Sequence, residues 1–366
     1  MRKIFLILIS IIFFSFLLFF ISINFPKEKQ KPLSPLSKLI TQTQNQKVLY
    51  IPEHLTLDKI FADNHDWTAT LSAEQKITII ATGDYIPARS VNFMATQKND
   101  FTWPVRNVAS ITANADLTLT NLESPLIANC PVINEGMVFC GSQKHLEGIK
   151  LAGIDLVNVA NNHFGNYGID GINETLDILK KNNINFIGNN NIFYQKIKNT
   201  TFAFLSYNQI GYKENGISWI DKEQIKKDLS EARKKAQIVI IVFHWGVEYM
   251  PQPEEENRQL AHFAIDHGAD LVIGNHPHWI QPVEIYHDKL ITYAHGNFVF
   301  DQEWSEETKQ GIIGKYIFYE NKLIDAQFTP IKIRNYGQAY LPEGKESQKI
   351  LDKLKEESQK LQTNQK

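Results

Sequence analysis

The sequence predicts an α/β layered domain that follows an N-terminal membrane-spanning segment. From Lys76 onward, apolar runs alternate with amphipathic stretches, which is the pattern of strands alternating with helices. A long apolar run near the N-terminus predicts the membrane segment. The 366 residues have 43% hydrophobic content, enough to bury one large core or two modest ones.

The N-terminal apolar run extends from Ile4 to Phe25, after Arg2 and Lys3. At helical rise it is long enough to cross a hydrocarbon core of ~30 Å. A cleaved signal peptide, the alternative, would have a shorter apolar region and a small-x-small site, which the run lacks at its end. We therefore expect residues 1–26 to be a retained single-pass anchor. The basic residues that follow the run outnumber those before it, but a long following domain often translocates regardless of flanking charge, so the orientation stays open.

The rest of the chain divides by composition. Residues 27–74 are rich in Lys, Gln, Pro, Ser and Thr without a sustained period, and we interpret them as a stalk and lead-in. The folded domain is expected at 75–361, with a polar tail at 362–366. A formal charge of −2 and the lack of a basic stripe interleaved with aromatics argue against nucleic acid as a partner.

Four amphipathic segments predict helices, at 168–183, 222–236, 254–268 and 345–361. In the first, apolar residues recur at helical spacing and so share one face: Ile169, Ile172, Leu176 and Leu179. The last has its packing side at Ile350, Leu351, Leu354 and Leu361.

Polar side chains stand at the ends of six predicted strands, which span 76–84, 115–123, 155–163, 236–244, 270–278 and 289–301. The carboxyl ends of strands in layered α/β sheets border the ligand crevice, so we expect these side chains to converge. They are Asp84, Glu123, Asn161, Asn162, His163, His244, His276, His278, His295, Asn297 and Asp301.

Each of these residues alone has an ordinary structural explanation, such as a turn, a helix cap or a core histidine. Together they form a mixed oxygen and nitrogen ligand set without thiolate. That set suits two first-row divalent cations such as Mn²⁺, Fe²⁺ or Zn²⁺, which predicts a hydrolase site. Pro277 would stiffen the link between His276 and His278.

Two further residues are candidates for catalysis. Arg89 would clamp an anionic group, or else lies at the surface or caps a helix. Glu248 would support the metal ligands or face the substrate. Trp245 and Trp279 would wall a pocket or fill core.

The two cysteines, Cys130 and Cys140, enclose a short loop containing Pro131 and Gly136. This spacing would allow a disulfide in an oxidising compartment, which favours an extracytoplasmic domain. Two unrelated buried thiols are the alternative.

The motifs at the strand ends occur in a familiar order. They are "GDYIPAR", "NLESPL", "ANNHFGNYG", "HWGVEY", "GADLVIGNHPHWIQPVE" and "YAHGNFVFD". From Lys76 to Asp301 the chain resembles the CapA family of capsule and poly-γ-glutamate synthesis proteins, which are related to calcineurin-like metallophosphoesterases.

The resemblance implies a four-layer α/β/β/α metallophosphoesterase-like sandwich. It implies His163 as the acid that protonates a leaving group, and an anionic envelope polymer and other capsule synthesis or export proteins as partners. The metal ligands that it implies are Asp84, Glu123, Asn162, His244, His276 and His278.

The chain departs from the family's pattern in three places. Asn275 stands where the family has a histidine, and Asn166 stands where it has an aspartate. His295 lies in the last motif, where it would compensate for a lost histidine or acid.

These residues favour a membrane-anchored, extracytoplasmic, metal-dependent hydrolase or transferase that acts on a phosphoester or amide bond. Asn166 and Asn275 motivate the alternative, a non-catalytic component that holds an anionic polymer during assembly or export. In a third interpretation the histidines are satisfied within an ordinary folded domain.

Overall fold

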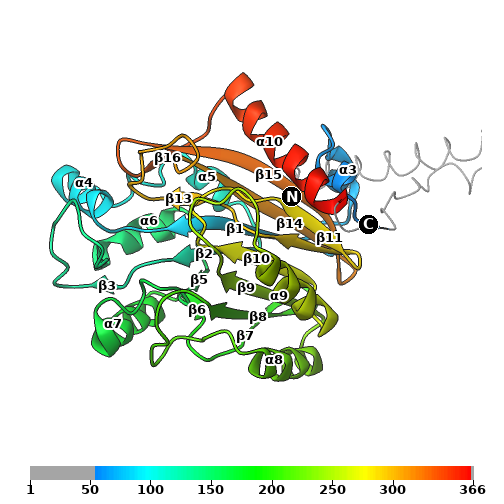
Figure 1. Cartoon of the computed structure of the whole chain (residues 1–366), viewed down its shortest axis with the longest axis horizontal. Coiled ribbons are helices and arrows are strands. Elements are labelled where there is room, and N and C mark those ends of the chain that lie inside the picture. The colour runs from blue at the N-terminus through cyan, green and yellow to red at the C-terminus, as the bar shows by residue number, and fades with distance from the viewer. Residues whose placement is uncertain (1–53, 364–366) are drawn as a thin grey trace, which may run out of the picture. The chain divides into compact units, whose positions relative to one another are not determined.

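The structure is a computed structural model that describes residues 54–363 (Figure 1). The predicted membrane anchor at 1–26 and most of the predicted stalk lie outside the described residues. Within residues 54–363, no helix combines the length and the apolar character needed to cross a membrane.

The described residues form an eight-stranded sheet in which β16-β15-β14-β1-β2-β5-β6 are neighbours and β13 pairs with β1. Strands β1, β2, β5 and β6 run parallel, because each is reached through helices or long loops. The bounds are β1 (Ile77–Tyr85), β2 (Leu117–Leu122), β5 (Leu156–Asn158), β6 (Asn185–Ile187), β13 (Asn297–Val299), β14 (Gln310–Tyr319), β15 (Lys322–Arg334) and β16 (Gln338–Tyr340).

A second sheet of six strands has the order β11-β12-β10-β9-β8-β7. Its central strands β8, β9, β10 and β12 are parallel. The bounds are β7 (Phe193–Ile197), β8 (Thr200–Asn208), β9 (Ile238–His244), β10 (Leu271–Asn275), β11 (Val283–Tyr286) and β12 (Lys289–Thr292). A small separate pair consists of β3 (Leu126–Ile127) and β4 (Gly141–Ser142).

The four helices predicted from the sequence are confirmed as α7 (Gly168–Lys181), α8 (Lys222–Lys235), α9 (Glu255–Asp266) and α10 (Gly344–Thr363). One predicted packing residue is wrong: Ile169, in the first turn of α7, is 51% exposed. The shorter helices are α3 (Leu57–Ile60), η1 (Asp66–Thr70), α4 (Ser90–Lys98), α5 (Ala109–Thr112), η2 (Gln143–His145) and α6 (Leu146–Leu151).

The buried side chains place the two sheets face to face, with helices on their outer faces. One core cluster joins alternate residues of β1 and β2 to alternate residues of β8, β9 and β10. A second packs the other face of the larger sheet against α4, α6 and α7. A third packs the smaller sheet against α8 and α9, which lie beside it in Figure 1. The predicted α/β class and its helix-sheet-sheet-helix layering are thus observed.

The parallel strands of both sheets end on the same side of the domain. In Figure 1 the arrows of β1, β2, β9 and β10 point away from α3, which lies at the opposite end. Leu55, Leu57 and Ile60 are buried in the core between the sheets. The described part of the predicted lead-in therefore packs within the domain, which was expected to begin at 75.

The strand predicted at 289–301 is instead two strands in different sheets, β12 in the smaller and β13 in the larger. The chain crosses between the sheets at Gly296, which has a φ of 71°. Its carbonyl accepts a hydrogen bond from the Asp84 N–H at 3.0 Å. A Cβ on Gly83 would lie 1.9 Å from that oxygen, so the crossing requires glycine at both positions.

Candidate metal centre

Five of the six predicted metal ligands gather between the ends of the two sheets. Asp84 is near the end of β1, Glu123 follows β2, and His244 is the last residue of β9. His276 and His278 follow β10 directly. All five are at most 4% exposed.

Their ligand atoms form three overlapping groups, each with its members' atoms within 4.8 Å of one another. Glu123 belongs to two of the groups, and Glu248 joins one of them with two histidines. Glu248, a candidate for catalysis from the sequence, also lies where it could be a metal ligand. The groups are Glu123, His244 and His276; Glu248, His276 and His278; and Asp84, Glu123 and His278.

The sixth predicted ligand, Asn162, lies at the edge of this cluster. Its Oδ1 is 2.8 Å from His244 Nε2. An amide oxygen in that position would bind either the imidazole N–H or a cation between them. The sequence motif therefore brings Asn162 to the centre, although β5 itself ends at Asn158.

The chemistry of the cluster fits a divalent cation. Glu123 Oε1 and His276 Nδ1 are buried and have no hydrogen-bond partner among the described residues. Leaving buried carboxylate and imidazole atoms unpaired costs about 1–3 kcal/mol each. A cation would provide the missing partner for both atoms.

The pKa shifts of these side chains also fit a metal site. Burial holds the pKa of Glu123 well above its usual range, and the carboxylates of Asp84 and Glu248 raise it further. Burial also holds the pKa of His244 and of His276 well below the usual range, with neighbouring imidazoles adding to the effect. A metal ion binds a neutral imidazole without displacing a proton from the nitrogen that it binds. Its positive charge would also relieve the repulsion among the crowded carboxylates.

Buried amides orient the candidate ligands. Asn121 Nδ2 donates to Asp84 Oδ1 at 2.8 Å and to Glu123 Oε2 at 3.1 Å. Asn121 Oδ1 in turn accepts from Asn158 at 2.9 Å and from Asn161 at 3.1 Å. The sequence interpretation missed Asn121 and Asn158. The available signal was an amide inside an apolar strand, since a buried amide needs polar partners.

The backbone between the paired histidines is unusual. His276 has a φ of 99° and His278 a φ of 56°, values that residues with a Cβ avoid. His278 Nδ1 lies 3.1 Å from Asp84 Oδ2 and 3.0 Å from Asn297 Oδ1. The strained link thus brings the His278 ring to the larger sheet while the His276 ring centroid lies 4.8 Å from that of His244, and strain of this kind is common at functional sites.

His163 lies beside the ligand groups. Its Nδ1 is 3.0 Å from Asn166 Oδ1, the same oxygen that accepts the Phe139 N–H at 2.7 Å. Because that oxygen is an acceptor, His163 Nδ1 is the donor and Nε2 carries the lone pair. Burial lowers the pKa of His163 to about 4, against a smaller opposite effect of Asn166. In this state His163 accepts a proton before it can donate one.

Arg89 has an ion-pair partner within the domain. Its guanidinium forms an ion pair with Asp301 and its side chain is 11% exposed. The guanidinium lies 4.9 Å from the ring centroid of Phe139 and 4.8 Å from that of Phe300. The Arg89–Asp301 pair thus supports two aromatic rings: Phe139 stacks on His163, and the Phe300 ring centroid lies 5.4 Å from that of His278.

The remaining residues singled out in the sequence take structural positions. His295 Nε2 lies 2.7 Å from the Tyr316 hydroxyl, and His295 belongs to none of the ligand groups. Asn275 is 3% exposed, and its Oδ1 has no hydrogen-bond partner among the described residues. Trp245 fills the core between the smaller sheet and its helices. Cys130 and Cys140 form the predicted disulfide.

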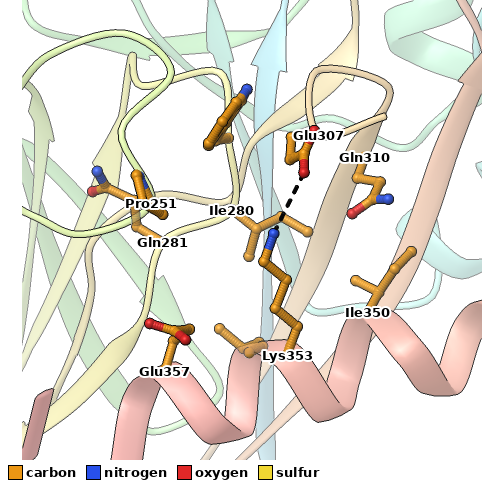
Figure 2. A pocket seen from close by; sticks show the side chains of 10 residues that line it. Pro251, Ile280, Gln281, Glu307, Gln310, Ile350, Lys353 and Glu357 are labelled. Atoms are coloured by element: carbon orange, nitrogen blue, oxygen red, sulfur yellow. Dashed lines mark ion pairs between the residues drawn. The ribbon is translucent and has the colours of Figure 1, made fainter. Parts of the chain in front are cut away.

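A pocket is lined in part by the residues that follow His278 in the sequence, and no candidate ligand lines it. Figure 2 shows it beside α10, with Lys353 of α10 paired to Glu307 at 3.7 Å. Trp279, the residue after His278, also lines it. The labelled side chains are Pro251, Ile280, Gln281, Glu307, Gln310, Ile350, Lys353 and Glu357.

Comparison with known proteins gives one family. The family model "Bacterial capsule synthesis protein PGA_cap" matches residues 78–302, a range that contains every candidate ligand. The PGA biosynthesis protein CapA of Bacillus subtilis (strain 168) is 31% identical over 286 residues, covering 74% of this chain and 75% of that protein. The capsule biosynthesis protein CapA of Bacillus anthracis is 28% identical over 283 residues, covering 71% of this chain and 68% of that protein.

The chain is also similar to solved structures, at low sequence identity. A hypothetical protein from Thermus thermophilus gives a TM-score of 0.48 at 14% identity, covering 70% of this chain and 100% of that chain. A phosphatase from Mycoplasma pneumoniae gives a TM-score of 0.47 at 14% identity, covering 70% of this chain and 94% of that chain.

Proposed function

This chain belongs to the bacterial capsule synthesis protein PGA_cap family, and from that premise we propose that it is a metal-dependent hydrolase or transferase of envelope-polymer synthesis. The single observation that carries the proposal is the cluster of three overlapping ligand groups. Two divalent cations, Mn²⁺, Fe²⁺ or Zn²⁺, are the proposed cofactors, since the donors are imidazole and carboxylate without thiolate.

In this proposal the ions are held by residues from both sheets. Bound cations would lower the pKa of water and stabilise negative charge on a reacting oxygen. The protein's own part is to fix the donor directions, which Asn121 does for Asp84 and Glu123 through its amide. The proposed ligands are Asp84, Glu123, Asn162, His244, Glu248, His276 and His278.

His163 is the proposed proton-transfer residue. Its Nδ1–H donates to Asn166, so Nε2 accepts a proton from the attacking group and can then donate it to the leaving group. In this order of proton transfers, His163 acts first as a base and then as the acid that the sequence predicted. Arg89 and Asp301 act on this step by holding the Phe139 ring that stacks on His163.

The proposed substrate class is based on the relatives, and the proposed location is based on the sequence and the disulfide. The B. subtilis relative carries the name PGA biosynthesis protein, which supports an anionic envelope polymer as substrate and a phosphoester or amide as the bond. The apolar run at 4–25 and the disulfide support a membrane-anchored chain with its domain outside the cytoplasm. Other capsule synthesis or export proteins are its proposed partners.

A second candidate function is a polymer-holding component without catalysis. It is favoured by Asn166, whose amide accepts the His163 hydrogen bond but adds no negative charge to support an imidazolium. Binding of a polymer at a metal site would survive that loss, whereas proton transfer would slow.

Metal analysis and turnover test the proposal together. The full-length chain, purified in detergent, stripped with a chelator and reloaded with Mn²⁺ or Zn²⁺, should retain about two ions. His276→Ala should lose at least one, and His287→Ala, whose side chain is 68% exposed, should lose none. Retention of no ion by the wild type would refute the metal centre.

Turnover separates the two candidate functions. Bis(4-nitrophenyl) phosphate and a γ-glutamyl 4-nitroanilide probe the two proposed bonds. Hydrolysis of either by the wild type, reduced at least ~100-fold in His163→Ala, supports the enzyme. Metal binding without hydrolysis of either probe favours the polymer-holding component.

A further inference from the structure

The disulfide-closed loop Cys130–Cys140 reaches the candidate metal centre through one side chain. Phe139 is 2% exposed, although the loop lies at the surface and leaves its other apolar side chains in solvent. Those side chains are Val132, Ile133, Met137 and Val138, exposed by 47%, 43%, 68% and 56%. The loop therefore buries one aromatic ring selectively.

That ring lies on His163. The two ring centroids are 3.8 Å apart and the planes differ by 18°, which is a stacked arrangement. The Phe139 N–H also donates to Asn166 Oδ1 at 2.7 Å, and His163 Nδ1 bonds the same oxygen at 3.0 Å. The Phe139 ring thus fixes the plane of the imidazole. Its backbone N–H holds Asn166 Oδ1, the oxygen that accepts the hydrogen bond from His163 Nδ1.

The other face of the loop is held by the start of α4. The Arg89 guanidinium stacks 4.9 Å from the Phe139 ring centroid, and its Nη1 donates to Gly136 O at 3.3 Å. Ser90 Oγ donates to Asn134 O at 2.9 Å. Arg89 in turn is fixed by its ion pair with Asp301. The loop is therefore clamped between α4 and His163, and the disulfide joins its two ends.

A histidine that transfers a proton needs its ring held in one plane. The imidazole torsion has broad wells, so a single hydrogen bond at Nδ1 leaves the ring free to rock about that bond. A stacked aromatic ring removes this freedom and aims Nε2 in one direction. Effective proton transfer depends on such geometry.

We propose that Phe139 is a positioning residue for His163 and that the Cys130–Cys140 disulfide keeps it in place. This inference rests on the proposed function, in which His163 transfers a proton. The competing explanation is that the loop only stabilises the fold, through the small cluster of Phe139 with Ile86, Ala88 and Phe300.

Chemical modification of His163 tests the contact without any need for catalysis or metal. The full-length chain is treated with diethyl pyrocarbonate, and modification of each histidine is followed by peptide mass spectrometry. In Phe139→Leu and in the double variant Cys130→Ser/Cys140→Ser, His163 should react ~10-fold faster than in the wild type, because the covering ring is lost or loosened. His287 should react at an unchanged rate.

Val138→Ala is the matched control: the Val138 side chain, next to Phe139 in the sequence, is 56% exposed, so its removal should leave the rate at His163 unchanged. Thermal unfolding of each variant shows that it is folded. If Phe139→Leu does not fold, the double cysteine variant, which retains Phe139, decides. A His163 rate within twofold of wild type in the folded variants would overturn the proposal.

Kinetics give a second readout that a merely stabilising loop would not change. With bis(4-nitrophenyl) phosphate, Phe139→Leu should lower kcat ~10-fold and leave KM within about twofold, while Phe139→Tyr, which keeps an aromatic plane, should restore most of kcat. Equal kcat in Phe139→Leu and wild type would contradict the proposal. If the wild type binds no ion and hydrolyses no probe, the proposed function fails, and the modification rates still decide the role of Phe139.

Discussion

At the residue scale, the two histidines after β10 combine an unfavourable backbone with an incomplete set of partners. Their positive φ values of 99° and 56° cost about 1–3 kcal/mol each, and His276 Nδ1 is buried without a partner among the described residues. Both penalties fall on the same short segment. The segment is therefore least stable when the centre holds no cation.

The strain at His276 predicts a difference between two substitutions that both remove the imidazole. His276→Gly should be more stable than His276→Ala by about 1–2 kcal/mol, because glycine adopts positive φ without a Cβ clash. Urea unfolding in the presence of a chelator measures this. Equal stabilities would mean that the backbone at 276 relaxes when the imidazole is removed.

A second residue-scale prediction concerns His65, far in sequence from the centre. Its Nδ1 lies 2.8 Å from Asp325 Oδ2, and this hydrogen bond raises the pKa of His65 despite the opposing effect of burial. A raised folded pKa gives stability that is complete below the unfolded pKa of ~6.5 and is lost as pH rises through the folded value.

Unfolding experiments on wild type and His65→Gln from pH 5.5 to 8.5 check the sign. The wild type should lose its advantage over His65→Gln as pH rises above ~6.5. A difference that grew with pH would show that His65 is stabilising in its neutral form.

The sequence predicted most single residues of the centre because they follow apolar strands, where a polar residue is conspicuous. Glu248 was not predicted as a ligand because it lies four residues beyond His244, in a loop, and periodicity does not predict the path of a loop. The contacts of Arg89 could not be predicted for the same reason: its partners Phe139 and Asp301 come from distant loops.

At the element scale, α10 protects an edge of the smaller sheet. Strand β11 is at that edge, and the Val283 N–H donates to Ser358 Oγ at 2.9 Å. The Ile285 N–H donates to Gln362 Oε1 at 2.9 Å, and Gln362 Nε2 donates back to Ile285 O at 3.0 Å. Polar side chains of a helix thus replace the missing neighbouring strand, which prevents edge-to-edge pairing.

This covering predicts unequal effects of two serine substitutions in the same helix. Ser358→Ala should cost about 1–3 kcal/mol, because it leaves the buried Val283 N–H without an acceptor. Ser347→Ala, on the half-buried face of α10, should change stability by less than ~0.5 kcal/mol. Chemical denaturation of both variants measures the difference, and equal costs would contradict a special role for Ser358.

The helices were predicted well from their amphipathic period, including α10. Its buried Ser358 was not predicted, because a serine on an apolar face has no distinct period. The segment 289–301 was predicted as one strand because its apolar pattern is continuous. A single glycine, Gly296, carries it into the other sheet, and only the pairing with β1 reveals this.

At the scale of the whole molecule, the candidate centre joins two sheets that otherwise meet through apolar side chains. Asp84 and Glu123 come from the larger sheet, and His244 and His276 from the smaller. A cation bound to both would link the sheets directly and stabilise the fold, by ~2.7 kcal/mol at a free concentration 100 times its dissociation constant.

Removing one buried carboxylate should therefore change stability in opposite directions with and without metal. In a chelator, Glu123→Gln should be more stable than wild type by about 0.5–2 kcal/mol, because the raised pKa of Glu123 reflects an unfavourable buried charge. In excess Mn²⁺ the wild type should be the more stable. Thermal unfolding under both conditions measures this, with the exposed Glu147→Gln as control. The same order in both conditions would argue against a metal at Glu123.

The layer order was expected from the family resemblance rather than from hydrophobic period alone. Periodicity shows that strands alternate with helices, but it does not show that β14 returns beside β1 or that two sheets face each other. Those pairings join residues more than two hundred positions apart, such as Ile79 and Tyr316. Local sequence patterns do not predict them.

The position of α3, at the end of the domain away from the strand ends (Figure 1), has a consequence for a chain proposed to be anchored ahead of it. The described chain enters the domain through α3, so the candidate centre lies at the far end of the domain from this point of entry.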